Sequence, residues 1–183
     1  MKFTKGYWMN LPGVTNTDAV QVREVKVEND RVYLYTVPYH ADMRAMGGPL
    51  LEMYISSPQP DIIRTEAYHF MGSNQKMPAF ELNDAHCALE VENTETTVTI
   101  KSGNTKLVIG KNPCSFDYYY KDKKLTSIGN RFGNAMISTI STPDGNYMRA
   151  QMNLDIGEKV YGLGERFTPY VKNCLLYTSP SPR

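Results

Sequence analysis

Residues 20–37, VQVREVKVENDRVYLYTV, decide the fold class of this chain. Apolar residues alternate with polar ones along 20–27, with one break in phase, and a second apolar run follows at 32–37. Alternation at period two is typical of a β-strand, because successive side chains point to opposite faces of a sheet. Residues 28–30 (END) favour a turn. The stretch therefore predicts a β-hairpin.

The same pattern continues along the chain in short runs bounded by Asn, Asp, Gly or Pro. No stretch sustains the 3.6-residue period of an amphipathic helix. Further strands are expected at 51–56, 62–70, 88–91, 96–101, 106–109, 115–120, 125–128, 135–140, 147–153 and 159–163, with turns at 93–94, 102–104 and 142–146. About a dozen strands at intervals of about 8 to 12 residues predict an all-β fold, an antiparallel β-sandwich. Residues 42–49 and 71–78 are expected to form surface loops.

Length and charge exclude several classes of protein. The chain has 183 residues, fewer than the ~200 to 250 that a complete (β/α)₈ barrel needs. Twenty Lys and Arg against 19 Asp and Glu leave a net charge of +1, too little to attract nucleic acid or an anionic membrane. No apolar run approaches the ~18 residues of a spanning helix, and residues 1–13 lack the apolar core of a secretory signal. We therefore expect a soluble, cytoplasmic chain.

The cysteines and histidines do not indicate a cofactor or metal site. Cys87, Cys114 and Cys174 are odd in number and irregularly spaced, which argues against a disulfide framework and a zinc site. The three histidines, His40, His69 and His86, lie far apart in the sequence. We expect no cofactor and no metal.

Carboxylates and aromatic residues offer only weak functional signals. The pairs Glu90 with Glu92 and Asp155 with Glu158 could act on a glycosidic bond, but a solvated sheet face explains the first pair better. Residues 118–120 (YYY) and Trp8 could stack on sugar rings, although aromatic residues in strands more often serve packing. Without a further signal, these residues define no active site.

The last ten residues, 174–183 (CLLYTSPSPR), differ abruptly from the preceding sequence. The codons TGT CTC TTA TAC ACA TCT CCG AGC CCA CGA would encode this stretch and match a common transposase adapter. We therefore expect residues 174–183 to be an adapter-derived tail rather than native sequence. The native frame would then be interrupted near Asn173, and residues 1–173 would be the N-terminal piece of a longer protein.

Residues 157–173, GEKVYGLGERFTPYVKN, resemble the end of the N-terminal domain of glycoside hydrolase family 31, especially of its bacterial α-xylosidases. VYGLGERF is specific to that family. Weaker similarities occur in the family's order at 6–13 (GYWMNLPG), 20–25 (VQVREV), 63–72 (IRTEAYHFMG), 91–95 (VENTE) and 101–104 (KSGN). The resemblance covers about residues 1–173.

This resemblance implies a galactose-mutarotase-like β-sandwich that precedes a (β/α)₈ catalytic barrel. It implies retaining hydrolysis of α-glycosidic bonds, with one barrel Asp as nucleophile and another as general acid and base. Neither Asp has a counterpart here, so no catalytic residue is assigned. Gly162, Gly164, Glu165 and Arg166 correspond to positions of the family motif and are expected to be structural.

The resemblance implies a carbohydrate substrate bound through the barrel and no nucleic acid or membrane partner. It leaves a homo-oligomeric full-length enzyme open. Two alternatives remain. One is a free-standing carbohydrate-binding module, which would need an exposed aromatic platform. The other is a mutarotase in which His69 or His86 acts with Glu165 as acid and base.

Overall fold

A computed structural model describes residues 3–5, 9–38, 50–69, 85–129, 137–154, 156–162 and 171–173. Every regular element in these ranges is a β-strand, and every strand pairing is antiparallel. The predicted all-β class is confirmed. No helix long and apolar enough to cross a membrane occurs in these ranges.

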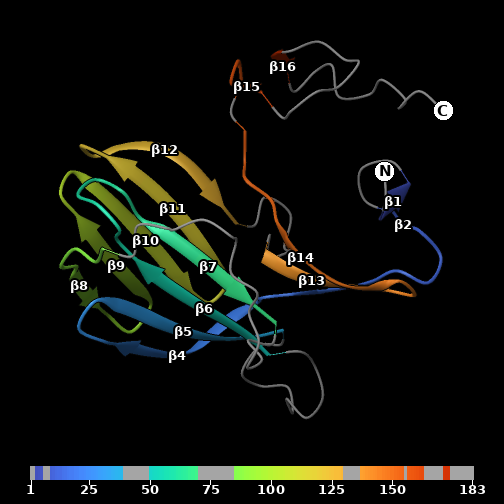
Figure 1. The fold of residues 1–183 in the computed structure, drawn as a ribbon, viewed down its shortest axis with the longest axis horizontal. Helices are drawn as coiled ribbons and strands as arrows, with labels where there is room; N and C mark the ends of the chain where they lie inside the picture. The colour runs from blue at the N-terminus through green and yellow to red at the C-terminus, as the bar shows by residue number, and fades with distance from the viewer. Residues whose placement is uncertain are drawn as a thin grey trace.

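Two large sheets form the sandwich, and Figure 1 shows them as facing layers. The first has the order β4-β5-β6-β7 and the second the order β12-β11-β10-β9-β8. The bounds in the first sheet are β4 (Gln21–Val27), β5 (Arg31–Val37), β6 (Leu51–Ser56) and β7 (Arg64–Tyr68). In the second they are β8 (Glu90–Asn93), β9 (Thr97–Ser102), β10 (Thr105–Lys111), β11 (Cys114–Tyr120) and β12 (Lys123–Ile128).

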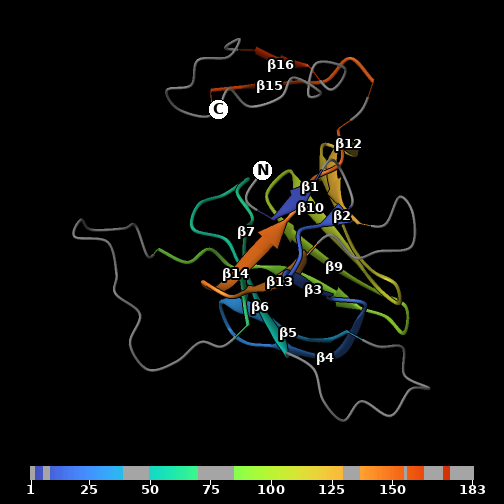
Figure 2. The same ribbon diagram turned by 90° about the vertical axis from the view of Figure 1, so that its right-hand side faces the viewer.

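Three smaller sheets complete the described fold. The order β14-β13-β3 joins β3 (Thr15–Asp18) to the hairpin of β13 (Ile137–Thr142) and β14 (Gly145–Ala150). The remaining pairs are β1 (Thr4–Lys5) with β2 (Met9–Asn10), and β15 (Lys159–Tyr161) with β16 (Val171–Asn173). In Figures 1 and 2 the pair β15–β16 lies apart from the two large sheets.

The hydrophobic core lies between the two large sheets because each strand contributes alternate residues to it. On β5, Val32 and Leu34 are buried, whereas the intervening Tyr33 is half-buried on the outer face. One cluster of buried residues unites both sheets: Ala19, Val22, Val32, Leu34, Leu51, Met53, Ile55, Val98, Ile100, Leu107, Ile109, Cys114, Phe116, Ile128 and Ile137. Burying a large aliphatic or aromatic side chain contributes about 1.5 to 3 kcal/mol, so this shared core holds the sheets together.

The break in phase at residues 20–27 has a structural cause. The register of β4 against β5 shifts between Val22 and Glu24, which is the signature of a β-bulge. Because the bulge adds one residue, both Val22 and Val25 turn toward the core although they are three positions apart. The sequence irregularity therefore marks a bulge within one strand.

The Asp61 corner is a group of polar residues that joins the two large sheets: Ser57, Asp61, Ser102, Asn104 and Thr105. The backbone N–H of Asn104 donates to Asp61 Oδ1, and Thr105 Oγ1 donates to the Asp61 carbonyl at 2.6 Å. The hydroxyl oxygens of Ser57 and Ser102 lie 2.7 Å apart and are buried. Asp61 has a positive φ of 67°, which Asp tolerates better than most residues. These bonds fix one turn of the first sheet onto the β9–β10 hairpin.

Most predicted strands and turns agree with the structure. The strand predicted at 51–56 coincides with β6, and the turn at 142–146 connects β13 to β14, where Thr142 Oγ1 donates to the Gly145 carbonyl at 2.9 Å. Strands β1, β2, β3 and β16 were not predicted. The expected loops at 42–49 and 71–78 lie outside the described residues.

Candidate functional site

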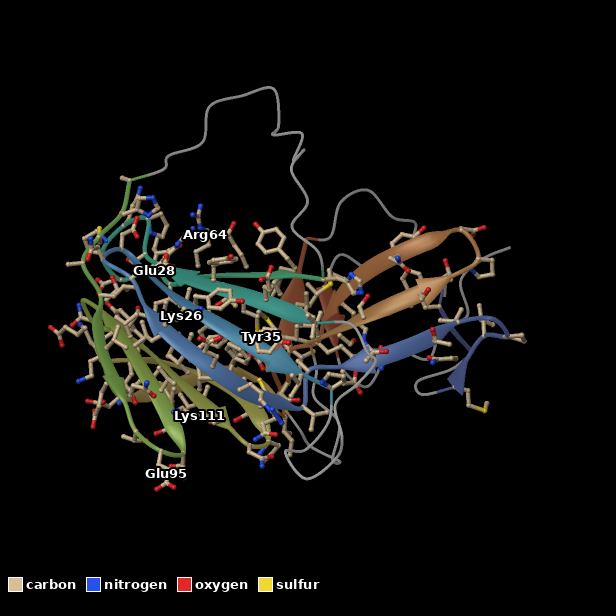
Figure 3. All side chains as sticks on the ribbon, turned by 90° about the horizontal axis from the view of Figure 1, so that it is seen from below. Lys26, Glu28, Tyr35, Arg64, Glu95 and Lys111 are labelled. Atoms are coloured by element: carbon tan, nitrogen blue, oxygen red, sulfur yellow. The ribbon has the colours of Figure 1, made fainter. Side chains whose placement is uncertain are left out.

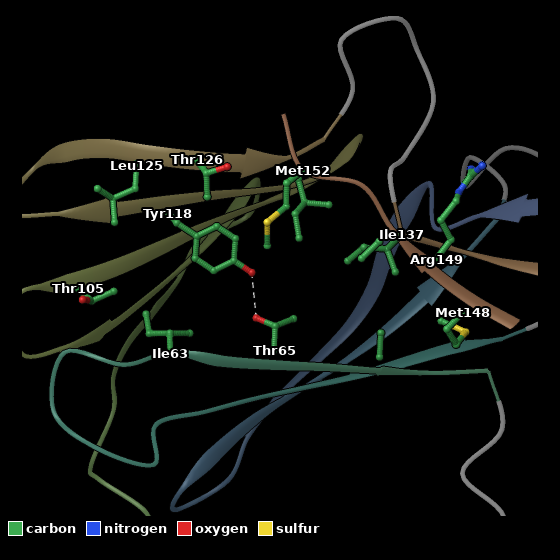
Figure 4. Close-up of a pocket in the computed structure, with 13 residues that line it drawn as sticks. Ile63, Thr65, Thr105, Tyr118, Leu125, Thr126, Ile137, Met148, Arg149 and Met152 are labelled. Carbon is green, nitrogen blue, oxygen red and sulfur yellow. Dashed lines mark hydrogen bonds between the residues drawn. The ribbon is translucent and has the colours of Figure 1, made fainter. Parts of the chain in front are cut away.

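An apolar cleft lies where edge strands β7 and β12 leave the two sheets open, with β13 and β14 beside them (Figure 4). Its volume is about 570 Å³. Aliphatic and methionine side chains from both sheets and from the β13–β14 hairpin dominate its lining. The lining residues are Ile63, Thr65, Ala67, Thr105, Tyr118, Leu125, Thr126, Ile128, Ile137, Met148, Arg149, Ala150 and Met152.

Tyr118 and Thr65 bridge the two sheets inside the cleft. The Tyr118 hydroxyl lies 3.0 Å from Thr65 Oγ1, as the dashed line in Figure 4 marks. Burial raises the pKa of Tyr118, and the hydrogen bond from Thr65 opposes this shift. The phenol is therefore neutral at physiological pH, and its role in this geometry is to join the sheets rather than to transfer protons.

Arg149 borders the cleft, but its guanidinium points away from the cavity (Figure 4). Its Nη2 lies 3.3 Å from Asp18 Oδ1, and its Nε donates to Ser138 Oγ at 2.9 Å. The side chains of Arg149 and Asp18 are only 25% and 18% exposed, so water screens this pair less than a surface ion pair. The pair connects β14 to β3 and leaves no unpaired carboxylate to act as an acid or base.

The cleft has an exposed apolar rim. Leu125, Met148 and Met152 are 51%, 39% and 60% exposed although they line the cavity. Ile156 and Tyr161, farther along the chain, are also largely exposed. Apolar surface gathered around a cleft is typical of a site that another protein surface covers. The cleft has the chemistry of a packing surface and lacks that of an active site.

The residues of the family motif are only partly described. Gly162 directly follows β15 and has a positive φ of 84°, a conformation that favours glycine. Gly164, Glu165 and Arg166 lie outside the described residues, so their structural role stays a prediction.

The carboxylate pairs and histidines considered from the sequence do not form a site in the described structure. Glu90 and Glu92 are exposed on edge strand β8, as a solvated sheet face requires. His86 Nε2 lies 3.7 Å from Asp30 Oδ2 on the surface. Asp155 and Glu165 lie outside the described residues, as does His40. Among the residues that the structure places, no group of three or more His, Cys, Asp or Glu could hold a metal ion.

The consecutive tyrosines separate onto two faces of β11. Tyr118 lines the cleft, whereas Tyr119 lies under Lys106, whose Nζ is 5.0 Å from the ring centroid. The exposed Tyr120 contacts Lys121 in the same way at 5.5 Å. Trp8 lies outside the described residues. Tyr118 is therefore a packing residue, and the three tyrosines share no platform.

The cysteines in the described ranges are free thiols. Cys114 is buried in the core, and burial raises the pKa of its thiol to about 12. A thiol held neutral in this way is a poor nucleophile, because the thiolate is the reactive form. Cys87 is half-buried.

Residues 52–177 match the family model of the glycosyl hydrolase 31 N-terminal galactose mutarotase-like domain. The chain belongs to this family. The match runs from β6 to β16 and therefore includes the whole five-stranded sheet and strands β6 and β7 of the four-stranded sheet. It places the chain among the glycoside hydrolases and confirms the galactose-mutarotase-like sandwich expected from the sequence.

Two curated relatives of this glycosyl hydrolase 31 domain are α-xylosidases. The chain is 28% identical over 180 residues to α-xylosidase XylQ of Lactiplantibacillus pentosus, and 29% identical over 194 residues to an α-xylosidase of Emericella nidulans. Each alignment covers 94% of this chain but only 23% and 25% of the respective relative. The chain therefore spans about a quarter of the length of these relatives.

Solved structures share the fold of this domain. The cycloalternan-forming enzyme of Listeria monocytogenes, in complex with a pentasaccharide substrate, superposes with a TM-score of 0.64 at 18% identity, covering 92% of this chain and 14% of that enzyme. A family 31 dextranase of Flavobacterium johnsoniae, complexed with isomaltotriose, gives a TM-score of 0.61 at 14% identity, covering 85% and 18% of the respective chains. At these identities the likeness concerns the fold alone.

Sequence reasoning missed the cleft because its lining comes from strands far apart in the chain. Ile63 and Thr65 precede Met148 and Met152 by more than eighty positions, and no local motif connects them. The available signal was the apolar character of Met148 and Met152 within the strand predicted at 147–153. The cleft depends on how strands that are distant in the sequence pair with one another, and local sequence does not predict that pairing.

Proposed function

We propose that this chain is the non-catalytic N-terminal sandwich domain of a retaining α-glycosidase that acts on α-xylosides. The observation that carries the proposal is the family match over residues 52–177. The two α-xylosidase relatives, of which this chain spans about a quarter, support the choice of substrate. The two catalytic carboxylates would lie in a (β/α)₈ barrel elsewhere in the parent protein, and α-xylosyl groups such as those of xyloglucan oligosaccharides are the proposed substrate.

We also propose a domain organisation in which residues 1–173 are the sandwich domain and residues 174–183 are an adapter-derived tail. The family match extends four residues into this tail, to residue 177. Sequencing the source DNA beyond the codon for Asn173 tests both statements. We expect a continuous reading frame that encodes a barrel with two catalytic Asp residues. A natural frame that encodes CLLYTSPSPR and then stops would contradict them.

An activity assay tests the non-catalytic role. The 183-residue chain, incubated with 4-nitrophenyl α-xyloside, should release no nitrophenol above the buffer rate, whereas the full-length parent should release it readily. Turnover by the short chain would contradict the proposal. A full-length parent that hydrolyses other α-glycosides but no α-xyloside would overturn only the choice of substrate.

The β7–β12 cleft supports a structural role for this domain. Its apolar lining and exposed rim, with Leu125 and Met152 more than half exposed, suit a surface that packs on the remainder of the enzyme. We expect the isolated chain to bind a hydrophobic dye and to associate in solution.

A matched pair of variants tests the contribution of the cleft. Leu125→Ser, at a site 51% exposed on the cleft rim, should reduce dye fluorescence and association. Val27→Ser, at a site 56% exposed on β4 and outside the cleft lining, should change neither. Equal effects of the two substitutions would show that general surface hydrophobicity, and not the cleft, is responsible.

A further inference from the structure

The outer face of the four-stranded sheet carries four tyrosines, which we call the tyrosine face: Tyr33 and Tyr35 on β5, Tyr54 on β6 and Tyr68 on β7. They share this face because the inward positions of β5 and β6 hold core residues such as Leu34 and Met53. All four are half-buried, so each has part of its surface open to solvent. Figure 3 views the molecule from below, with Tyr35 labelled on this sheet.

The rings form a continuous strip across three strands. Tyr33 lies opposite Tyr54 in the register of β5 and β6, with ring centroids 5.3 Å apart. Tyr54 in turn contacts Tyr68 edge-on at 6.1 Å. Because the rings fix one another, little side-chain freedom remains to be lost when a ligand binds.

Hydrogen-bonding groups lie between and beside the rings. Tyr33 donates its hydroxyl to Glu52 Oε1 at 3.0 Å, and Tyr68 donates to Glu66 Oε1 at 3.1 Å. The guanidinium of Arg31 lies 4.8 Å from the centroid of Tyr54. Burial, followed by the hydrogen bond to Glu52, raises the pKa of Tyr33 to about 12, so the phenol remains a neutral donor.

Charges of both signs surround the tyrosines. Three cations and four carboxylates lie on or beside this face: Lys26, Arg31 and Arg64, with Glu24, Glu28, Glu52 and Glu66; Arg31 pairs with Glu28. Lys26 pairs with Glu24 at 3.1 Å and Arg64 with Glu66 at 3.3 Å. A surface without excess positive charge gives no electrostatic preference for nucleic acid or an anionic membrane. It suits an uncharged ligand that is rich in donors and acceptors.

The large exposed aliphatic side chain within strands β4 to β7 is Val27, and its pairing with the core residue Val32 places it on the inner face and not on the tyrosine face. Stable protein interfaces place apolar side chains at their centre, so this composition fits a protein partner less well. Aromatic rings pack on the C–H faces of a pyranose, carboxylates accept from its hydroxyls, and guanidinium groups donate to them. We propose that the tyrosine face binds a neutral oligosaccharide.

Titration of the 183-residue chain with neutral oligosaccharides tests this proposal independently of enzymatic activity. The probes are xyloglucan heptasaccharide, cellohexaose and maltohexaose, with a heparin hexasaccharide as an anionic control. In ¹H–¹⁵N NMR spectra, at least one neutral probe should shift the amide signals of β5, β6 and β7 in a saturable manner. Saturable shifts confined to the β7–β12 cleft, or none with any neutral probe, would overturn the proposal.

Matched variants locate the binding site. Tyr54→Ala should weaken binding by about tenfold, the loss that corresponds to about 1.4 kcal/mol. Tyr119→Ala is the control, because Tyr119 also lies under a cation, Lys106, but on the outer face of the other sheet. It should leave the dissociation constant unchanged. Tyr68→Ala on edge strand β7 provides a second test if Tyr54→Ala does not fold.

Other outcomes would assign the face differently. Equal losses in the Tyr54 and Tyr119 variants would show that the probe has no preference for the tyrosine face. Self-association abolished by Tyr54→Ala, without sugar-dependent shifts, would identify a protein contact instead. Absence of activity in the full-length enzyme would leave a positive titration intact, so failure of the proposed function is distinguishable from failure of this inference.

Discussion

At the Asp61 corner the two large sheets are closed by polar bonds, whereas at the β7–β12 edge they stand apart around an apolar cleft. The corner combines a carboxylate, two buried serine hydroxyls and a threonine hydroxyl within a few residues. In the cleft, the side chains of Thr65 and Tyr118 bridge the sheets, while Leu125 and Met152 are exposed. The end of the sandwich where the two turns of the Asp61 corner meet is therefore closed by its own hydrogen bonds, while the β7–β12 edge has the surface of an interface.

The largest expected effect on stability is found when the same substitution, Leu to Ala, is made in the packed core and at the rim of the open cleft. Leu107→Ala removes a fully buried side chain and should lower the free energy of unfolding by about 2 to 5 kcal/mol, because a cavity remains. Leu125→Ala, at a site 51% exposed, should cost less than about 1 kcal/mol. Urea denaturation of both variants measures the difference. Similar losses of unfolding free energy in the two variants would mean that the cleft is packed as tightly as the core.

The next effect concerns the Asp61 corner. Asp61→Ala should lower the free energy of unfolding by about 0.5 to 1.5 kcal/mol, because the backbone N–H of Asn104 exchanges its carboxylate acceptor for water. Asp122→Ala is the matched control, since Asp122 also has a positive φ, 61° against 67° for Asp61, but makes only a surface contact with Lys106. Asp122→Ala should lower the free energy of unfolding clearly less than Asp61→Ala does. Thermal unfolding measures both variants. If both lose the same stability, the cause is the positive φ that the two positions share and not the hydrogen bonds of the Asp61 corner.

The pH dependence of stability tests the buried inner face. Burial raises the pKa of Cys114 from 9.0 to about 12, so between these values the unfolded chain releases a proton that the folded chain keeps. Stability from this group is fully present below pH 9 and should fall by about 1 kcal/mol per pH unit above it. Cys114→Ala should make the decline from pH 9 to 11 shallower, as measured by urea denaturation. An unchanged slope would contradict burial of this thiol.

The smallest effect concerns the bridge inside the cleft. Thr65→Val keeps the shape of the side chain but removes the partner of the Tyr118 hydroxyl, and should cost about 1 kcal/mol or less. Thr65→Ser retains the hydroxyl and should preserve the bond. Thermal unfolding of the two variants compares them. A loss as large as that of Leu107→Ala would show that the bridge, and not the core, holds this edge together.

Strand positions in the sandwich followed from local alternation, and the sequence predicted them well. The hairpin of β4 and β5 and strand β6 appear where period two places them, because one face of each is buried. Strand β3, with the sequence TNTD, carries no apolar alternation and was missed. It forms because it pairs with β13, which lies far along the chain. Local sequence does not predict a pairing of such long range.

The candidate surfaces were harder to predict than the strands. The tyrosine face could be read in part, since Tyr33 and Tyr35 alternate with core residues, but its continuation through Tyr54 and Tyr68 depends on the register of β6 and β7. Asp61 gave no signal, because its role rests on a positive φ and on a turn more than forty residues away. Family resemblance supplied the fold and the enzyme class, but it identified neither surface.

Strand β3 also has a consequence for the order of folding. Its partner in the sheet is β13, and the ion pair between Asp18 and Arg149 spans 131 residues of sequence. During synthesis from the N-terminus, residues 15–18 must therefore wait until nearly the whole sandwich has left the ribosome before they can pair. Contacts of such long range slow folding, because the chain must close a large loop before they form. Strand β3 is thus made long before the partner strand that fixes its final place.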